Sequence, residues 1–297
     1  MTFEELGGKL RAISDSVGPS VVGIGQRWGV GSGVLVGSGR VVTNAHNVRR
    51  EEVTVTLPDG ATTTGTVTGA DVDRDLALVT IEDDSADSIA WSPDLASVGI
   101  GSTVFALSNP GGRGLRVTYG FVSGTERSFR GPRGRRIAGS IEHTAPLLPG
   151  SSGGPIVDLE GRLLGLNTNR LGEGFYLAIP ADESFKQRVD SLARGETPRR
   201  ARLGVGLAPA DVASGLRRAV GLPEREGLLI RAVEEGGPAD AAGMKEGDLL
   251  VEAGDKAIKD FDGLFDALET ANGELAVTIV RGVDEHTLTV ALRPNGG

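Results

Sequence analysis

The chain has 297 residues, of which 39% are hydrophobic and 24% are charged, so it can form one large domain or two ordinary ones with real cores. Its 46 glycines, 14 prolines and 4% aromatic residues favour short strands joined by tight turns and disfavour an all-helical bundle. The formal net charge of -9 gives no general attraction to phosphate backbones or anionic lipids, so nucleic acid is not expected as a partner.

The residue inventory limits the chemistry of any site. Cysteine is absent, which excludes disulfides, thiolate nucleophiles and cysteine-ligated zinc. The three histidines are His46, His143 and His286, so an imidazole base is one of these, and a metal cage built from histidines is not expected.

No apolar run approaches the roughly 20 residues of a membrane span. Residues 1 to 5 carry no basic region and no apolar stretch of the signal-peptide type. We therefore expect a cytoplasmic chain without a membrane span. A periplasmic or extracellular chain whose export signal had been removed would show the same N-terminal sequence pattern.

The chain begins with apolar residues at spacings of three and four from position 3 to 17, which predicts an amphipathic helix ended by Gly18 and Pro19. Its apolar face packs on its own domain or on a second subunit. From 20 to 180 the pattern changes to short β-rich runs divided by turn residues, which is typical of a barrel or sandwich, and two small barrels fit the length. These runs are 21–24, 33–36, 41–43, 53–57, 76–79, 104–107, 117–122, 156–157 and 175–179.

A second helix is predicted from Asp182 to Gly195, and residues 196 to 202 indicate an exposed linker. A second unit of small-domain size follows, with strands, a turn at Gly237 and Pro238, and a helix whose apolar residues are Phe261, Leu264, Phe265 and Leu268. The sequence thus predicts domains over 1–195 and 203–297, joined by the linker 196–202.

Three segments carry the residue types of nucleophilic catalysis. The string Gly150, Ser151, Ser152, Gly153, Gly154 lies between two β-rich runs, and its glycines allow backbone N–H groups to converge on a developing oxyanion. His46 stands at a strand end, and Asp75 directly precedes an apolar strand, where a carboxylate can hold an imidazole tautomer. Each alone is more often a turn or a surface residue, but their order His46, Asp75, Ser152 is that of chymotrypsin-type enzymes.

Together these segments resemble the HtrA (Deg) serine proteases. The resemblance rests on the runs Thr43-Asn44-Ala45-His46, Asp75-Leu76-Ala77, Asn109-Pro110-Gly111 and Pro149-Gly150-Ser151-Ser152-Gly153-Gly154-Pro155, and the second unit resembles the PDZ domain of that family. It implies a mainly β fold, a chymotrypsin-like double six-stranded β-barrel followed by an α+β PDZ domain. It also implies an ATP-independent endopeptidase that acts on unfolded or damaged proteins without a cofactor and assembles as a homotrimer.

The resemblance assigns the nucleophile to Ser152, the general base to His46 and the orienting carboxylate to Asp75. It assigns the oxyanion hole to the amides of Gly150 and Ser152, with the Ser151 amide nearby. Because the family commonly has Asn where this chain has Ser151, Ser151 remains an alternative nucleophile. His143 is a rival base, although we expect it to be structural, and His286 is expected to be solvated.

Substrate preference is expected to depend on two segments, 145–149 and 165–174, which resemble the specificity and activation loops of the family. Their residues Leu147, Leu148, Leu166, Asn167 and Thr168 suggest a small to medium apolar specificity pocket, although the leucines can equally belong to the core.

In the second unit, Leu203, Gly204, Val205 and Gly206 resemble the PDZ loop and strand that bind the terminal carboxylate of a peptide, and Leu264 and Leu268 would line the other groove wall. A peptide with an apolar C-terminal residue is the expected ligand. Two other functions stay open, a non-proteolytic chaperone or PDZ adaptor with a resting protease domain, and an esterase that uses the same triad.

Overall fold

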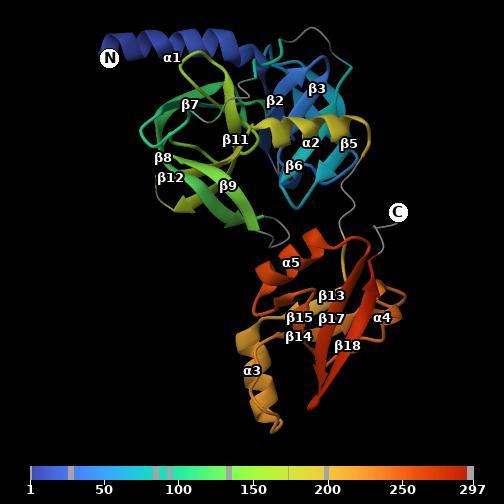
Figure 1. The fold of residues 1–297 in the computed structure, drawn as a ribbon. Coiled ribbons are helices and arrows are strands. Elements are labelled where there is room, and N and C mark those ends of the chain that lie inside the picture. The colour runs from blue at the N-terminus through green and yellow to red at the C-terminus, as the bar shows by residue number, and fades with distance from the viewer. Residues whose placement is uncertain are drawn as a thin grey trace. The chain divides into compact units, whose positions relative to one another are not determined.

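The structure is a computed structural model that describes residues 2–25, 30–82, 87–91, 95, 97–131, 136–172, 174–196 and 201–292. The chain divides into two compact units, Met1–Pro198 and Arg199–Gly297 (Figure 1). This division falls within the expected linker 196–202, of which residues 197–200 lie outside the described residues.

Twelve strands of the first unit form two barrels. The strands are β1 Val21–Ile24, β2 Gly31–Gly37, β3 Arg40–Thr43, β4 Glu52–Thr56, β5 Thr62–Asp71, β6 Leu76–Thr80, β7 Thr103–Ser108, β8 Arg116–Arg130, β9 Arg136–His143, β10 Pro155–Val157, β11 Leu163–Gly172 and β12 Phe175–Pro180. They close in the orders β1-β2-β3-β6-β5-β4 and β10-β11-β12-β9-β8-β7, and neighbouring strands are antiparallel. The predicted mainly β fold with two six-stranded barrels is confirmed.

Strands such as β3 and β6 are buried on both faces because one face lies inside the barrel and the other is covered. Successive strand residues point to opposite faces, so Val22 and Val41 lie in the core cluster inside the first barrel, whereas their neighbours Val21 and Val42 lie in a larger cluster. This larger cluster also contains residues of the second barrel, such as Phe105, and it packs the two barrels into one unit.

Two helices complete the first unit. Helix α1, Phe3–Val17, begins with a capping box in which the Glu5 amide donates to Thr2 Oγ1 at 3.2 Å, and helix α2, Glu183–Ala193, is capped by Asp182. Both predicted helices are confirmed. Their buried residues join the cluster that packs the barrels together, so α1 covers its own unit with part of its apolar face.

The prediction of a loop over residues 165–174 is wrong for most of this segment. Residues Leu163–Gly172 form β11, which pairs with β10 on one side and with β12 on the other. The polar run Asn167, Thr168, Asn169 is typical of a loop, but the side chains of Asn167 and Thr168 are buried within a strand.

The described residues of the second unit form an antiparallel sheet with three helices. Its strands are β13 Val205–Ala208, β14 Leu228–Val233, β15 Leu249–Ala253, β16 Lys256–Ala257, β17 Glu274–Arg281 and β18 Asp284–Ala291. Its helices are α3 Ala210–Ala219, α4 Pro238–Ala241 and α5 Phe261–Thr270. The order β13-β14-β15-β17-β18 leaves β13 at one edge, and β16 pairs with β15. The expected helix is α5, whereas α3 is not predicted by the sequence. Among the helices that the structure describes, none has the length and apolar run needed to cross a bilayer.

Candidate active site

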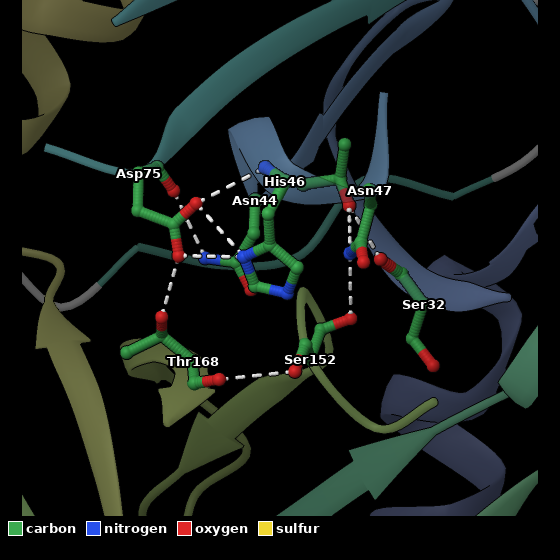
Figure 2. Close-up of polar contacts among 8 residues, drawn as sticks. Ser32, Asn44, His46, Asn47, Asp75, Ser152 and Thr168 are labelled. Atoms are coloured by element: carbon green, nitrogen blue, oxygen red, sulfur yellow. Dashed lines mark hydrogen bonds and ion pairs between the residues drawn. The ribbon is translucent and has the colours of Figure 1, made fainter. Parts of the chain in front are cut away.

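His46 and Asp75 form a close pair at the ends of two strands of the first barrel. His46 lies in the short 3-10 turn Ala45–Asn47 that follows β3, and Asp75 directly precedes β6. His46 Nδ1 lies 2.9 Å from both carboxylate oxygens of Asp75, and the His46 amide donates to Oδ1 at 3.1 Å (Figure 2). A carboxylate accepts, so Nδ1 carries a proton, and in the neutral imidazole the lone pair of Nε2 is left to act as a base.

Asp75 is held in a conformation that few residues adopt. Its φ is 54°, in the left-handed region, and its side chain is 2% exposed. Asn44 Nδ2 donates to the Asp75 carbonyl at 2.9 Å, and the Thr168 hydroxyl donates to Oδ2 at 2.6 Å. These contacts fix the carboxylate that orients the His46 ring.

Ser152 lies in the loop between β9 and β10 and is joined to the pair through Thr168. Its hydroxyl donates to the Thr168 carbonyl at 3.0 Å (Figure 2). Thr168 therefore contacts both Asp75 and Ser152, one through its hydroxyl and the other through its carbonyl. Among the described contacts there is no hydrogen bond between the Ser152 hydroxyl and His46. The structure thus brings the three predicted triad residues to one place, with the serine hydroxyl turned to a backbone acceptor.

The serine loop belongs to the second barrel but is held by residues of the first. The Ser152 carbonyl accepts from the Ser32 amide at 2.8 Å and from Asn47 Nδ2 at 2.9 Å, and the Gly150 carbonyl accepts from the Ser32 hydroxyl at 2.9 Å. Sequence reasoning missed Ser32, Asn44 and Asn47. Asn44 and Asn47 flank His46 in sequence, whereas nothing local indicates that Ser32 contacts this loop.

The loop leaves two amides available for an oxyanion. Gly150 has φ 87°, a conformation open to glycine. In the described part of the chain, the N–H groups of Gly150 and Ser152 donate no hydrogen bond, whereas the Ser151 amide donates to the Leu148 carbonyl at 3.1 Å. The Ser151 side chain is buried and donates to Ser108 Oγ at 3.1 Å. The Ser151 amide, which was expected near the oxyanion hole, is therefore already paired in this structure.

The residues expected in the specificity pocket separate into two groups. Leu148 is 56% exposed, whereas Leu147 is partly buried and packs against a core cluster of the second barrel. Leu166 and Asn167 are fully buried, the first in the core that packs the barrels together, and Thr168 is 8% exposed. Neither Leu166 nor Asn167 offers a surface to a substrate, which corrects their expected place in the pocket.

The other two histidines lie apart from the triad. His143 ends β9, is fully buried, and bonds through Nε2 to Asn167 Oδ1 at 2.9 Å. Burial lowers the pKa of His143 to about 4, against the opposing effect of the Asn167 hydrogen bond. His143 is therefore uncharged at neutral pH and is bonded away from Ser152. His286 lies exposed on β18, as expected.

The residues expected to bind a peptide in the second unit lie at one sheet edge and on one helix. Gly204, with φ 76°, precedes β13, which contains Val205 and Gly206 and pairs with β14 along one side. Leu203, Leu264 and Leu268 are buried in the core of this unit and offer no exposed surface to a peptide, which corrects the expectation that Leu264 and Leu268 line a groove wall.

Comparison with known proteins agrees with this arrangement. A family model described as a trypsin-like peptidase domain matches residues 31–166, and one described as a PDZ domain matches residues 229–281. The structure resembles that of the HtrA-type protease AlgW with a decapeptide, with a TM-score of 0.70 and 23% identity over 97% of this chain and 99% of that one. It resembles the serine endoprotease of Yersinia pestis with a TM-score of 0.69 and 24% identity, over 97% and 98% of the two chains. Both likenesses show the fold.

Relatives with assigned names extend the likeness to sequence. The chain is 32% identical to the serine protease Do-like HtrA of Bacillus subtilis, over 75% of this chain and 54% of that protein. It is 35% identical to HhoA of Synechocystis sp., a candidate serine protease by its name, over 88% of this chain and 70% of that protein. A protein of Rickettsia conorii, named for its likeness to the periplasmic serine endoprotease DegP, is 29% identical over 89% of this chain and 53% of that protein. The chain spans about half the length of the first and third of these relatives. By its sequence and its fold, the chain belongs to the HtrA (Deg) family of serine proteases.

Proposed function

We propose that the chain is a serine endopeptidase in which Ser152 is the nucleophile, His46 the general base and Asp75 the carboxylate that orients His46. The observation that carries this proposal is the pair of 2.9 Å contacts between His46 Nδ1 and the buried Asp75 carboxylate. In the neutral imidazole they place the proton on Nδ1 and leave the lone pair on Nε2, and Thr168 joins the same carboxylate to the loop of Ser152.

In the reaction, the Ser152 hydroxyl turns about its Cα–Cβ bond from the Thr168 carbonyl to His46 Nε2. A change between staggered rotamers about this bond redirects a serine hydroxyl. His46 takes the proton as Ser152 attacks a peptide carbonyl, and it returns the proton to the leaving amine. Water then attacks the acyl-enzyme by the same route. The free amides of Gly150 and Ser152 stabilise the oxyanion.

The substrates we propose are unfolded or damaged polypeptides, cleaved without ATP. Leu147 and Leu148 form an apolar approach to the serine loop and favour small to medium apolar residues at the cleaved bond. We further propose that the protease assembles as a homotrimer. The exposed apolar residues Leu115, Tyr119 and Phe121, at and beside β8, support an apolar contact of this kind, and sizing of the protein in solution tests it.

For the second unit we propose capture of peptide C-termini. Strand β13 lies at the edge of its sheet, so a peptide can add to it as a further strand, and the turn at Gly204 can present amides to the terminal carboxylate. A peptide with an apolar last residue and a free carboxylate should bind. The same peptide with an amidated end should not.

Replacement of each adjacent serine tests the catalytic assignment. Ser152→Ala should abolish cleavage of an unfolded protein such as reduced casein, whereas the matched control Ser151→Ala should keep it. Persistent cleavage by Ser152→Ala would refute the assignment.

A second function is a chaperone or PDZ adaptor with a resting protease domain. The hydrogen bond from the Ser152 hydroxyl to the Thr168 carbonyl favours it, because in that rotamer the hydroxyl is not engaged by its base. Suppression of aggregation without any cleavage by the wild type, with and without an apolar C-terminal peptide, would support this second function over the first. Hydrolysis of simple esters without cleavage of any polypeptide would indicate an esterase.

A further inference from the structure

His143 is a buried imidazole that the proposed mechanism does not use. It ends β9 and has no exposed surface, and its ring stacks on Tyr176 with centroids 5.8 Å apart. Nε2 lies 2.9 Å from Asn167 Oδ1. Nδ1 is also buried, and it has no hydrogen-bond partner among the residues described.

The other contacts of Asn167 determine which nitrogen of His143 carries the proton. Asn167 Nδ2 donates to the Gly154 carbonyl at 3.0 Å and to the Pro155 carbonyl at 3.4 Å. Carbonyl oxygens only accept, so the amide nitrogen of Asn167 faces them and its oxygen faces His143. His143 is therefore the tautomer protonated at Nε2, and it is the donor to Asn167.

Asn167 in turn holds the serine loop by its backbone. The Gly153 amide donates to the Asn167 carbonyl at 2.8 Å, and the Asn167 amide donates to the Gly154 carbonyl at 2.9 Å. The Gly154 carbonyl thus accepts from both the main chain and the side chain of Asn167. The next residue, Thr168, is the one that contacts Asp75 and Ser152.

We propose that His143 is a positioning residue for the serine loop. Its Nε2–H holds the Asn167 amide in the orientation that fixes Gly154, and through the backbone it fixes Ser152. An apolar side chain would fill the same space and would bury no nitrogen without a hydrogen-bond partner, whereas His143 buries Nδ1 in this state among the residues described. The imidazole supplies what an apolar residue lacks, a donor. The positioning of the loop is argued from these contacts alone, and only its expected effect on catalysis rests on the proposed function.

Two substitutions separate the donor from the space that it fills. His143→Phe keeps a ring on Tyr176 and removes the donor, whereas His143→Gln places an amide nitrogen near the position of Nε2. Val104→Ala is the matched control, because it shortens another fully buried side chain of the same barrel. His143→Leu repeats the first variant if His143→Phe does not fold.

Catalysis is measured with the full chain, as the rate of labelling by a small fluorophosphonate and as kcat and KM on a short peptide. Misplacement of the loop should slow labelling and kcat by about 10- to 100-fold in His143→Phe, with KM unchanged. His143→Gln should restore most of the rate, and Val104→Ala should lose stability without this loss. The proposal would be overturned if His143→Phe were labelled at the wild-type rate, or if His143→Gln were labelled as slowly as His143→Phe.

An independent measurement uses amide hydrogen exchange in the Ser152→Ala chain, which needs no activity. Exchange of the Gly153 amide should be faster in His143→Phe and should return toward the wild-type rate in His143→Gln. Unchanged exchange in His143→Phe overturns the inference whatever the activity. A wild type that neither cleaves protein nor reacts with fluorophosphonate, while the exchange responds as expected, refutes the proposed function and supports the positioning role.

Discussion

The buried histidine makes the stability of the first unit depend on pH below neutrality. His143 titrates at about 4 in the folded chain and at 6.5 when it is exposed by unfolding. Between these values the unfolded chain binds a proton that the folded chain does not bind, so the free energy of unfolding falls as the pH falls from 6.5 to 4. Above pH 6.5 the imidazole is neutral in both states and contributes nothing to the pH dependence.

The size of the effect follows from the two pKa values. The full difference of about 2.5 units corresponds to about 3 kcal/mol, reached below pH 4, and about 2 kcal/mol of it is lost between pH 7.5 and pH 5. Carboxylates add their own dependence, so the informative quantity is the difference between wild type and His143→Gln. The wild type should lose about 2 kcal/mol more than this variant over that interval.

Urea unfolding followed by tryptophan fluorescence measures this difference. Both tryptophans, Trp28 and Trp91, belong to the first unit, so the signal reports on the unit that contains His143. The measurement uses the Ser152→Ala chain to prevent self-cleavage. His286→Gln is the control, since it removes an exposed histidine of the second unit and should leave the wild-type slope unchanged. Equal pH slopes for wild type and His143→Gln would refute the reasoning.

Three further substitutions test the site and the core. Thr168→Val removes the hydroxyl that donates to Asp75 and should lower kcat/KM by about 10- to 100-fold, the effect of one hydrogen bond to a charged group; unchanged peptide hydrolysis would show that Asp75 does not need this donor. Gly153→Ala would place a Cβ 2.0 Å from the Ser32 carbonyl oxygen at a φ of +88°, so fluorophosphonate labelling should be lost, and labelling at the wild-type rate would contradict the described loop. Phe105→Ala should reduce the stability of the first unit by about 3–5 kcal/mol, as urea unfolding reports, and a loss under 1 kcal/mol would contradict its burial.

The proposed triad could be found from the sequence because each member lies in a short local motif. The runs around His46, Asp75 and Ser152 combine a reactive side chain with the turn or strand end that presents it. Their order in the chain is also that of chymotrypsin-type enzymes. Thr168 could not be assigned in the same way. Its partner Asp75 lies 93 positions away, and only the closure of both barrels brings them within hydrogen-bond distance.

Helix α3 was missed for a different physical reason. Val212 and Leu216 are 43% and 40% exposed, whereas Arg217 is 4% exposed. Arg217 satisfies its guanidinium by donating to the carbonyls of Pro223 and Gly282. The apolar residues thus do not mark the buried face, and the usual spacing rule has no signal to detect.

Ser32 has a consequence for how this protein can be divided or recombined. It belongs to β2, and its amide and hydroxyl bind the carbonyls of Ser152 and Gly150, while the Asn109 amide donates to its hydroxyl at 3.0 Å. A fragment that contained the second barrel alone would lack these partners at the nucleophile. Complementation between separately produced halves should therefore restore labelling only when both halves associate, and a chimera with a foreign first half needs a hydroxyl donor at this one strand position.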